Sequence, residues 1–304
     1  MTFRFKILGS SSNGNCALLE TKDCKVLIDA GFSARRTRAM LTESGCEPEQ
    51  IDAIFLTHEH QDHSAGIKGL SQLPKLKVFA NRDTAQAVQQ SLKRKVTWQI
   101  FETGSEFNFA NLKVKTFSIP HDAYDPVGFV FTVGGQDLFH PRLSLAWATD
   151  LGHIPPHLAE AVGSVDVLVL EANYDPELLD RDTRRPPSVK QRIRGRHGHL
   201  SNEMARAFLQ QFARPRWKQV YLAHLSKDCN EVERVRAYFK PNPSPLPYCL
   251  DVVDPHGCQP DDCVWDYQAQ VKKWTMLHSQ ALEKKRYHPL AAKTKKFYQP
   301  QFSW

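Results

Sequence analysis

The chain of 304 residues is 41% apolar, 24% charged and 10% aromatic. This composition excludes a disordered chain, collagen and a coiled coil, and the length permits one large hydrophobic core or two modest ones. Forty Lys and Arg against 33 Asp and Glu give a net charge of +7, which makes an anionic partner a reasonable hypothesis.

The positive charge is concentrated in two segments. Residues 181–218 hold eleven Lys and Arg against two acidic residues, and residues 265–304 hold eight against two. The remainder of the chain therefore has a net charge of −8. We expect a folded domain over residues 1–264 and a basic C-terminal extension over residues 265–304.

The cysteines and apolar runs indicate a cytoplasmic protein that does not contact a membrane. The first six residues lack the apolar core of a secretory signal, and the apolar run at residues 165–170 is too short to span a bilayer. Seven cysteines without regular spacing favour free thiols in a reducing compartment.

The predicted elements begin with a meander of three strands, followed by a helix that Ser33 caps and Gly45 ends. The predicted strands lie at residues 3–8, 17–20, 25–29, 52–57, 77–80, 98–101, 114–119, 128–133, 145–149, 165–171, 219–223 and 248–253. The predicted helices lie at residues 34–44, 64–73, 83–93, 156–162, 202–212 and 230–239. This mixture predicts an α/β or α+β architecture with helices over both faces of sheets. A proline-rich connector at residues 241–247 and a polar tail from about Asp261 complete the chain.

The strongest chemical signal is the hexad His58-Glu59-His60-Gln61-Asp62-His63, directly after a predicted strand. A loop leaving a strand can direct His58 and His60 to one point and Asp62 and His63 to another. Four potential ligands in six residues therefore suit two adjacent cations. The alternative is a polar surface loop with clustered histidines.

Two cations need more donors than the hexad provides, and at least one shared oxygen. Four other polar residues come where a predicted apolar strand ends: Asp29, His121, Asp150 and His224. Each of these alone is more often a structural residue, but their order beside the hexad favours a metal site.

In this order, the hexad and the four strand-end residues resemble the five motifs of the metallo-β-lactamase fold, a four-layer αββα sandwich with metals at the open edge of two sheets. The resemblance covers residues 1 to about 255. It implies two metal sites, one formed by His58, His60 and His121 and the other by Asp62, His63 and His224, with Asp150 bridging both. It also implies that Asp29 orients the ligands of the hexad.

Such a site implies hydrolysis. Two divalent ions roughly 3.5–4 Å apart polarise a bridging water to hydroxide near neutral pH and stabilise the oxygens that gain charge. The nitrogen and oxygen donors suit zinc best and leave manganese possible. Asp62 and His199 are the candidate catalytic residues.

Four further segments, at residues 10–15, 170–175, 190–202 and 224–228, resemble the WalJ-type (YycJ-type) bacterial branch of this fold. That resemblance implies a nuclease that cleaves phosphodiesters of DNA, as a 5′-to-3′ exonuclease, with RNA as the alternative substrate. Cys229 departs from the branch, which usually has Asn there, and the tail beyond Tyr267 has no counterpart.

Other hydrolases of the fold remain alternatives. A thioesterase similar to the glyoxalase II group keeps the same hexad, and a cyclic phosphodiesterase would also fit. A nucleic-acid-binding protein without activity is a third possibility, which the complete ligand set disfavours. A β-lactamase is disfavoured because the chain has no export signal.

His199 precedes Ser201, the predicted N-cap of a helix from Asn202, so a phosphate there would meet a histidine and free backbone N–H groups. His199 would protonate the leaving alkoxide or hold the scissile phosphate; the alternative is a histidine bonded to local backbone. The candidate substrate contacts are Ser11, Asn13, Asn15, Asn173, Tyr174, Arg192, Arg196 and Ser201.

Each of these contacts has a structural alternative. Residues 10–15 would form a nest of N–H groups for a terminal phosphate or a hairpin turn. Asn173 and Tyr174 would face substrate or fill the core, and the arginines at 184–196 would follow a phosphate backbone or remain solvated. A zinc site at Cys249, His256, Cys258 and Cys263 is disfavoured because the spacing contains no CxxC pair.

Overall fold

A computed structural model describes residues 2–135, 142–240, 246–257 and 263–270. The chain divides into a compact unit, Met1–Asp266, and a C-terminal segment, Tyr267–Trp304, of which the structure describes residues 267–270. Cys258 and the basic tail from residue 271 lie outside the described residues. Among the described helices, none combines the length and apolar character needed to cross a bilayer.

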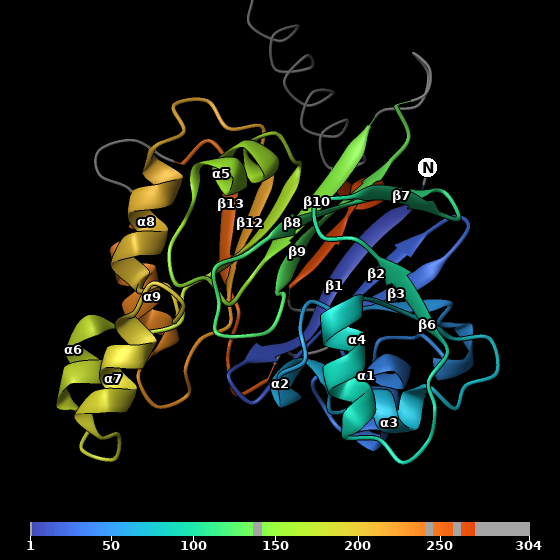
Figure 1. The fold of residues 1–304 in the computed structure, drawn as a ribbon. Helices are drawn as coiled ribbons and strands as arrows, with labels where there is room; N and C mark the ends of the chain where they lie inside the picture. Colours follow the sequence, from blue (N-terminus) through green and yellow to red (C-terminus); the bar gives the residue numbers. More distant parts are fainter. Residues whose placement is uncertain (1, 136–141, 241–245, 258–262, 271–304) are drawn as a thin grey trace, which may run out of the picture. The chain divides into compact units, whose positions relative to one another are not determined.

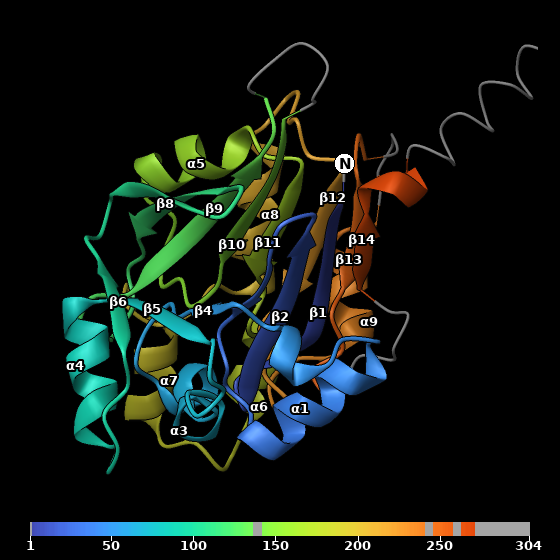
Figure 2. The ribbon, with the colours of Figure 1, turned by 90° about the vertical axis from the view of Figure 1, so that its right-hand side faces the viewer.

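Two seven-stranded mixed sheets form the centre of the compact unit (Figures 1 and 2). The first has the strand order β14 (Val264–Asp266), β1 (Phe3–Ser11), β2 (Gly14–Thr21), β3 (Lys25–Ile28), β4 (Ala53–Phe55), β5 (Lys77–Asn81), β6 (Trp98–Phe101). The second has the order β13 (Cys249–Val252), β12 (Gln219–Ala223), β11 (Val167–Glu171), β10 (Leu143–Ala148), β9 (Val127–Val133), β8 (Leu112–Ser118), β7 (Glu106–Phe109).

Helices cover the outer face of each sheet (Figure 2). Those beside the first sheet are α1 (Ala34–Glu43), α2 (Gln61–Ser64), α3 (Ile67–Leu70) and α4 (Arg82–Gln90), with a 3-10 turn at Pro48–Gln50. Those beside the second are α5 (Pro156–Gly163), α8 (Asn202–Gln210) and α9 (Val232–Tyr238), with α6 (Pro176–Arg181) and α7 (Pro187–Arg194) at one end (Figure 1). The predicted αββα sandwich is confirmed.

Aromatic side chains fill the space between the two sheets. Phe55 of β4 contacts Phe129 and Phe131 of β9, with ring centroids 5.8 and 5.2 Å apart. Phe5 of β1 contacts Trp147 of β10 at 6.4 Å. These edge-on contacts each add about 0.5–1.5 kcal/mol to the free energy of burying the rings. They hold the sheets together and thereby fix the strand ends from which the site is built.

The central strands are buried on both faces because helices cover one side and the other sheet covers the opposite side. Every residue of β11 and of β12 is buried, as expected for parallel strands between two layers. By contrast, β8 alternates, so that Lys113 and Lys115 face solvent. The periodicity of each strand thus follows its place in the layers.

The structure corrects three predicted elements. The predicted helix 64–73 is interrupted: α2 ends at Ser64 and α3 spans only Ile67–Leu70, because Gly66 N donates to the Ala30 carbonyl at 2.7 Å and not to the preceding helical turn. The tail does not begin near Asp261: β14 follows and pairs with β1. The first meander, expected at one edge of a sheet, consequently lies one strand in from the edge.

Candidate metal centre

Neighbouring parallel strands end at the site. In the first sheet β3 and β4 are parallel, and Asp29 and the hexad follow them. In the second sheet β10, β11 and β12 are parallel, with Asp150 close after β10 and His224 directly after β12. Because parallel strands have their carboxyl ends at one edge, these side chains meet although they are far apart in sequence.

Three of these strand-end residues have a left-handed backbone. Asp29, Asp150 and His224 have φ angles of 58°, 63° and 57°. Such angles are uncommon outside glycine and cost of order 1 kcal/mol or more, and they cluster at functional sites. The surrounding sheets impose this conformation, which turns each side chain sharply out of its strand.

The predicted ligands form two groups. Within each group, the potential donor atoms lie within 4.8 Å of one another. The first group is His58, His60 and His121, and the second is Asp62, His63, Asp150 and His224. Asp150 faces both groups: its carboxylate lies 3.7 Å from His121 Nε2 and 3.2 Å from His63 Nε2.

The donor chemistry of the first group fits a cation. His58 is fully buried, and its Nε2 has no hydrogen-bond partner among the described residues. Burial and the neighbouring His63 hold the pKa of His58 well below its usual value, and burial also lowers the pKa of His121. Neutral imidazoles with free lone pairs are what a divalent ion requires, since a protonated ring cannot bind one.

Asp29 lies behind the ligands. Its carboxylate is fully buried, accepts a hydrogen bond from Thr57 N at 2.8 Å, and lies 2.8 Å from His63 Nδ1. A carboxylate bonded to Nδ1 fixes the tautomer and leaves Nε2 free to bind a metal. Thr57 also contacts His58 Nδ1 at 3.0 Å, so one hydroxyl contacts two candidate ligands. Thr57 is not among the site residues predicted from the sequence.

Residues 12–13 form the hairpin turn between β1 and β2, so the segment 10–15 adopts one of the two expected alternatives. Ser11 pairs with Gly14, and the Ser11 hydroxyl accepts a hydrogen bond from Asn13 N. Asn13 is exposed, whereas Asn15 is fully buried and donates to the Asp62 carbonyl at 3.3 Å. Asn15 therefore supports the hexad loop from behind.

Glu171 is a buried carboxylate that the sequence analysis missed. Its Oε1 lies 2.8 Å from His199 Nδ1 and 2.9 Å from His224 Nδ1, and its Oε2 accepts from two backbone N–H groups. These three residues and Asp150 also form a group of closely spaced donors. Burial alone would raise the pKa of Glu171, but the two imidazoles lower it to about 2. The available signal was an acidic residue that ends the apolar run Val167–Leu170.

His199 lies beside the second group. Its Nδ1 is 3.9 Å from Asp150, and its side chain is 21% exposed. Burial opposes its protonation, but the Glu171 carboxylate raises its pKa above the usual value. Ser201 caps α8, as predicted, by accepting a hydrogen bond from Met204 N at 3.2 Å. His199 is thus bonded to a buried carboxylate rather than to local backbone.

Asn173 and Tyr174 are mostly buried. Asn173 donates to the His224 carbonyl at 2.7 Å, and Tyr174 packs in a small cluster with Leu179 and Cys229. Tyr174 therefore corresponds to the packing alternative. Asn173 also lines a pocket beside the metal centre.

The basic segment around α7 is largely paired with acidic side chains. Arg192 pairs with Asp122, and Arg185 pairs with both Asp182 and Asp228. Arg196 instead contacts His153 at 3.3 Å. Of the two arginines proposed as substrate contacts, Arg192 lines the pocket beside His199, and Arg196 is not among its lining residues.

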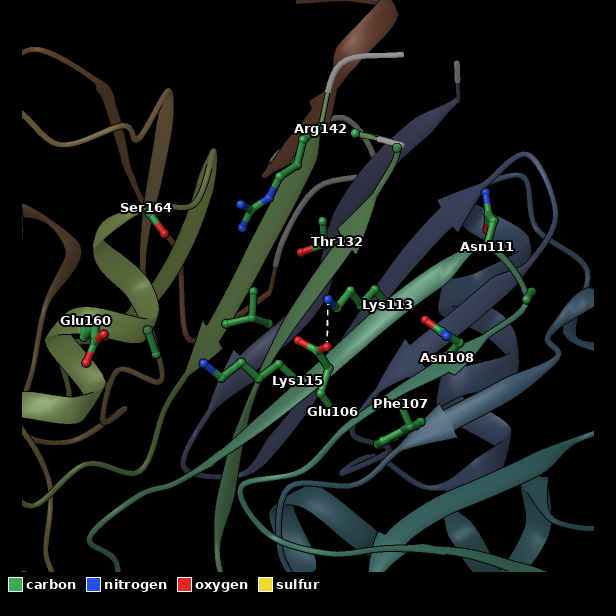
Figure 3. A pocket seen from close by; sticks show the side chains of 15 residues that line it. Glu106, Phe107, Asn108, Asn111, Lys113, Lys115, Thr132, Arg142, Glu160 and Ser164 are labelled. Carbon is green, nitrogen blue, oxygen red and sulfur yellow. Dashed lines mark ion pairs between the residues drawn. The ribbon is translucent and has the colours of Figure 1, made fainter. Parts of the chain in front are cut away.

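The described residues of the compact unit line a small hollow near the metal centre and a larger one away from it. One, of about 220 Å³, adjoins the metal centre. The other, of about 930 Å³, lies over β7, β8 and β9 and is lined by Lys113, Lys115 and Arg142 (Figure 3). Lys113 there pairs with Glu106 at 2.7 Å. This larger hollow contains none of the candidate ligands.

Cysteine does not contribute to the metal centre within the described ranges. Cys249 is exposed and Cys263 is partly buried, and the clusters of potential ligands found among the described residues contain neither of them. Cys16, fully buried behind the site, has a raised pKa because of burial and the nearby Asp29 carboxylate.

Comparison with known proteins decides the family. The profile of the β-lactamase superfamily domain matches residues 25–225. The chain is 36% identical over 232 residues to exodeoxyribonuclease WalJ of Streptococcus pneumoniae, covering 75% of this chain and 83% of that protein. The chain belongs to the β-lactamase superfamily and, within it, to the WalJ/YycJ family.

Other comparisons agree with this membership. Exodeoxyribonuclease YycJ of Bacillus anthracis is 33% identical over 238 residues, covering 78% of this chain and 87% of that protein. The crystal structure of YhfI from Bacillus subtilis has the same fold, with a TM-score of 0.63 and 16% identity over 88% of this chain and all of that one. This WalJ/YycJ family member, with both His/Asp groups complete, is a metal-dependent hydrolase of ester bonds.

Proposed function

We propose that this protein is a cytoplasmic exonuclease that shortens DNA from the 5′ end. The observation that carries the proposal is the pair of ligand groups sharing Asp150, in a chain whose relatives WalJ and YycJ are named exodeoxyribonucleases. His58, His60 and His121 would hold one divalent ion and Asp62, His63 and His224 the other, with Asp150 between them. Zinc suits these donors best, and manganese is the second candidate.

When bound, two such ions supply Lewis acidity that activates water and stabilises the charge on the phosphate oxygens. The chain itself supplies a proton. Water loses a proton to the solvent as its oxygen bonds to phosphorus, the bond between phosphorus and the 3′ oxygen breaks, and His199 delivers a proton to that oxygen and is reprotonated from the solvent. Glu171 orients His199 through Nδ1, so that the other ring nitrogen is available for the transfer.

Only some of the predicted substrate contacts lie at the pocket beside His199. Arg192 and Asn173 line the pocket beside His199, and Ser11 and Asn13 belong to the β1–β2 hairpin next to it. The other predicted contacts do not line the pocket: Arg196, Asn15, Tyr174 and Ser201. In this proposal they hold in place the loops and helices that surround the substrate. A thioesterase or cyclic phosphodiesterase has no observation that favours it over the nuclease.

The test is a substrate panel. The purified protein is incubated with zinc or manganese and with 3′-labelled duplex DNA, single-stranded DNA and RNA, and separately with a thioester. We expect shortening of DNA and none after chelation of the metal. Hydrolysis of the thioester with no nucleic acid shortened would overturn the proposal, and binding of DNA without turnover would indicate a non-enzymatic protein. Degradation of RNA in preference to DNA would revise the substrate.

A further inference from the structure

The pocket of about 220 Å³ opens directly from the proposed proton donor. It is smaller than the 300–1,000 Å³ typical of sites for drug-sized ligands, so it is too small for a base pair. Its lining residues are Ser12, Asp122, Asn173, Arg185, Val189, Arg192, Ile193, Gly198, His199 and Ser226.

One wall of the pocket is a face of α7. Val189, Arg192 and Ile193 are spaced i, i+3 and i+4, so they project from the same side of the helix. No residue of α7 is fully buried, so this face is partly accessible. It offers two branched apolar side chains and one guanidinium, which matches the apolar and anionic parts of a nucleotide.

Arg192 is held in place by an acidic neighbour. Its Nε donates to Asp122, which also lines the pocket and lies 3.4 Å from His121 Nε2. Because this bond uses Nε, the two terminal nitrogens of the guanidinium remain for an anion, in the fork geometry that suits phosphate.

Hydroxyl and amide groups also line the pocket. Ser12 belongs to the β1–β2 turn, Ser226 follows His224, and Asn173 donates to Ser12 Oγ at 3.4 Å. Arg185 adds a second cation, which Asp182 and Asp228 fix at 2.5 and 2.9 Å. The pocket thus combines hydrogen-bonding groups and two fixed guanidinium groups next to His199.

We infer that this pocket binds the 5′-terminal nucleotide of the DNA strand and that Arg192 contacts its terminal phosphate. The inference rests on the proposed function. In this placement the 3′ oxygen of the bound nucleotide is the leaving group beside His199, so each cut releases one nucleoside 5′-monophosphate. The remaining strand keeps the phosphate from the broken bond and presents the same 5′-phosphate for the next cut.

The experiment compares two oligonucleotides of one sequence, with a 5′-phosphate or a 5′-hydroxyl, as substrates of the full-length enzyme with zinc or manganese. We expect the 5′-phosphorylated strand to be degraded at least about ten-fold faster by kcat/KM, the effect of one charge-assisted contact. R192Q should reduce this preference to near unity, because it should slow degradation of the 5′-phosphorylated strand much more than that of the 5′-hydroxyl strand.

Arg194 provides the matched control. It is an arginine of the same helix with its own acidic partner, Asp180, at 2.5 Å, and it does not line the pocket. R194Q should keep the preference. Equal rates of the wild-type enzyme on both strands would overturn the inference and leave the proposed function intact, as would equal slowing of both strands by R192Q. Failure to degrade either strand would instead overturn the proposed function.

Product binding gives a readout independent of turnover. Thymidine 5′-monophosphate should bind the metal-free protein more tightly than thymidine in a calorimetric titration, and R192Q should remove the difference while R194Q keeps it. Equal affinity of the two compounds for the wild-type protein would count against the inference. Thermal unfolding of both variants at the wild-type temperature would show that the substitutions leave the fold unchanged.

Discussion

At the scale of single residues, His199 distinguishes metal binding from proton transfer. It contacts Glu171 and approaches Asp150, but it belongs to neither of the two predicted ligand groups. H199A should reduce turnover of DNA by about 10²–10⁴-fold, the usual contribution of a general acid, while bound metal measured by mass spectrometry stays unchanged. The exposed His197 serves as the control, and H197A should keep full activity. Full activity of H199A would show that His199 is not the general acid.

Asp150 should affect both ions because its carboxylate faces both groups. D150A is expected to lower the affinity for two equivalents of zinc, whereas H58A should weaken one equivalent and retain the other. A competitive titration against a metal-sensitive dye measures the two affinities separately. If D150A still bound two zinc ions as tightly as the wild-type protein, Asp150 would not bridge them.

Most of the candidate ligands could be predicted from the sequence alone, because the hexad concentrates four donors in six residues. Asp29, His121, Asp150 and His224 were recognisable since each interrupts an apolar strand. Glu171 was missed, although it also ends an apolar strand, because its role depends on two histidines that lie 28 and 53 residues further along the chain. Thr57 was missed for the same reason, because its role depends on contacts with Asp29 and His63 that only the fold creates.

At the scale of elements, β14 shows that a very short strand cannot be predicted from hydrophobic periodicity. Val264–Asp266 is three residues long and lies in a polar sequence, so no periodicity marks it as a strand. In the fold it pairs with β1, and Trp265 is 1% exposed and packs edge-on against Phe3 at 5.7 Å. A residue beyond the predicted boundary at 264 thus completes the core.

Removing the Trp265 ring should therefore destabilise the whole compact unit. W265A is expected to lower the free energy of unfolding by about 3–5 kcal/mol, the usual cost of a buried aromatic truncated to alanine. Urea unfolding followed by circular dichroism measures it. I100A, at a half-exposed apolar residue of β6, is the control and should change stability by less than about 1 kcal/mol. A W265A effect as small as that of I100A would show that β14 contributes little.

The helices α6 and α7 were missed for a different reason. Their sequence is rich in charge and proline, which reads as an irregular basic segment, yet Pro176 and Pro187 each occupy the first turn of a helix, where proline is tolerated. Asp175 caps α6 by accepting from Leu178 N at 3.0 Å. Of these two short helices, α7 forms a wall of the pocket beside His199. An element that the sequence did not predict is therefore the one that carries Arg192, the inferred contact of the 5′-phosphate.

At the scale of the whole molecule, the net charge of +7 conceals an uneven distribution. Within residues 181–218, several cations are paired with carboxylates: Arg192 with Asp122, Arg194 with Asp180, and Lys218 with Asp166. Pairing with carboxylates offsets much of the positive charge of this segment, and of these three cations only Arg192 lines the pocket beside His199. The eight Lys and Arg of residues 265–304 are therefore the better source of affinity that does not depend on DNA sequence.

Deleting residues 268–304 tests this division of roles. The deletion keeps β14 and the compact unit Met1–Asp266, so metal content and hydrolysis of a small phosphodiester should be unchanged. DNA affinity should fall at low salt, because binding that neutralises phosphates releases counterions, and the slope of log affinity against log salt should decrease by about 0.9 for each phosphate that the shortened protein no longer neutralises. Fluorescence anisotropy with a labelled duplex at several salt concentrations measures both quantities. An unchanged slope would mean that the tail does not bind DNA and that the arginines around α7 account for the attraction.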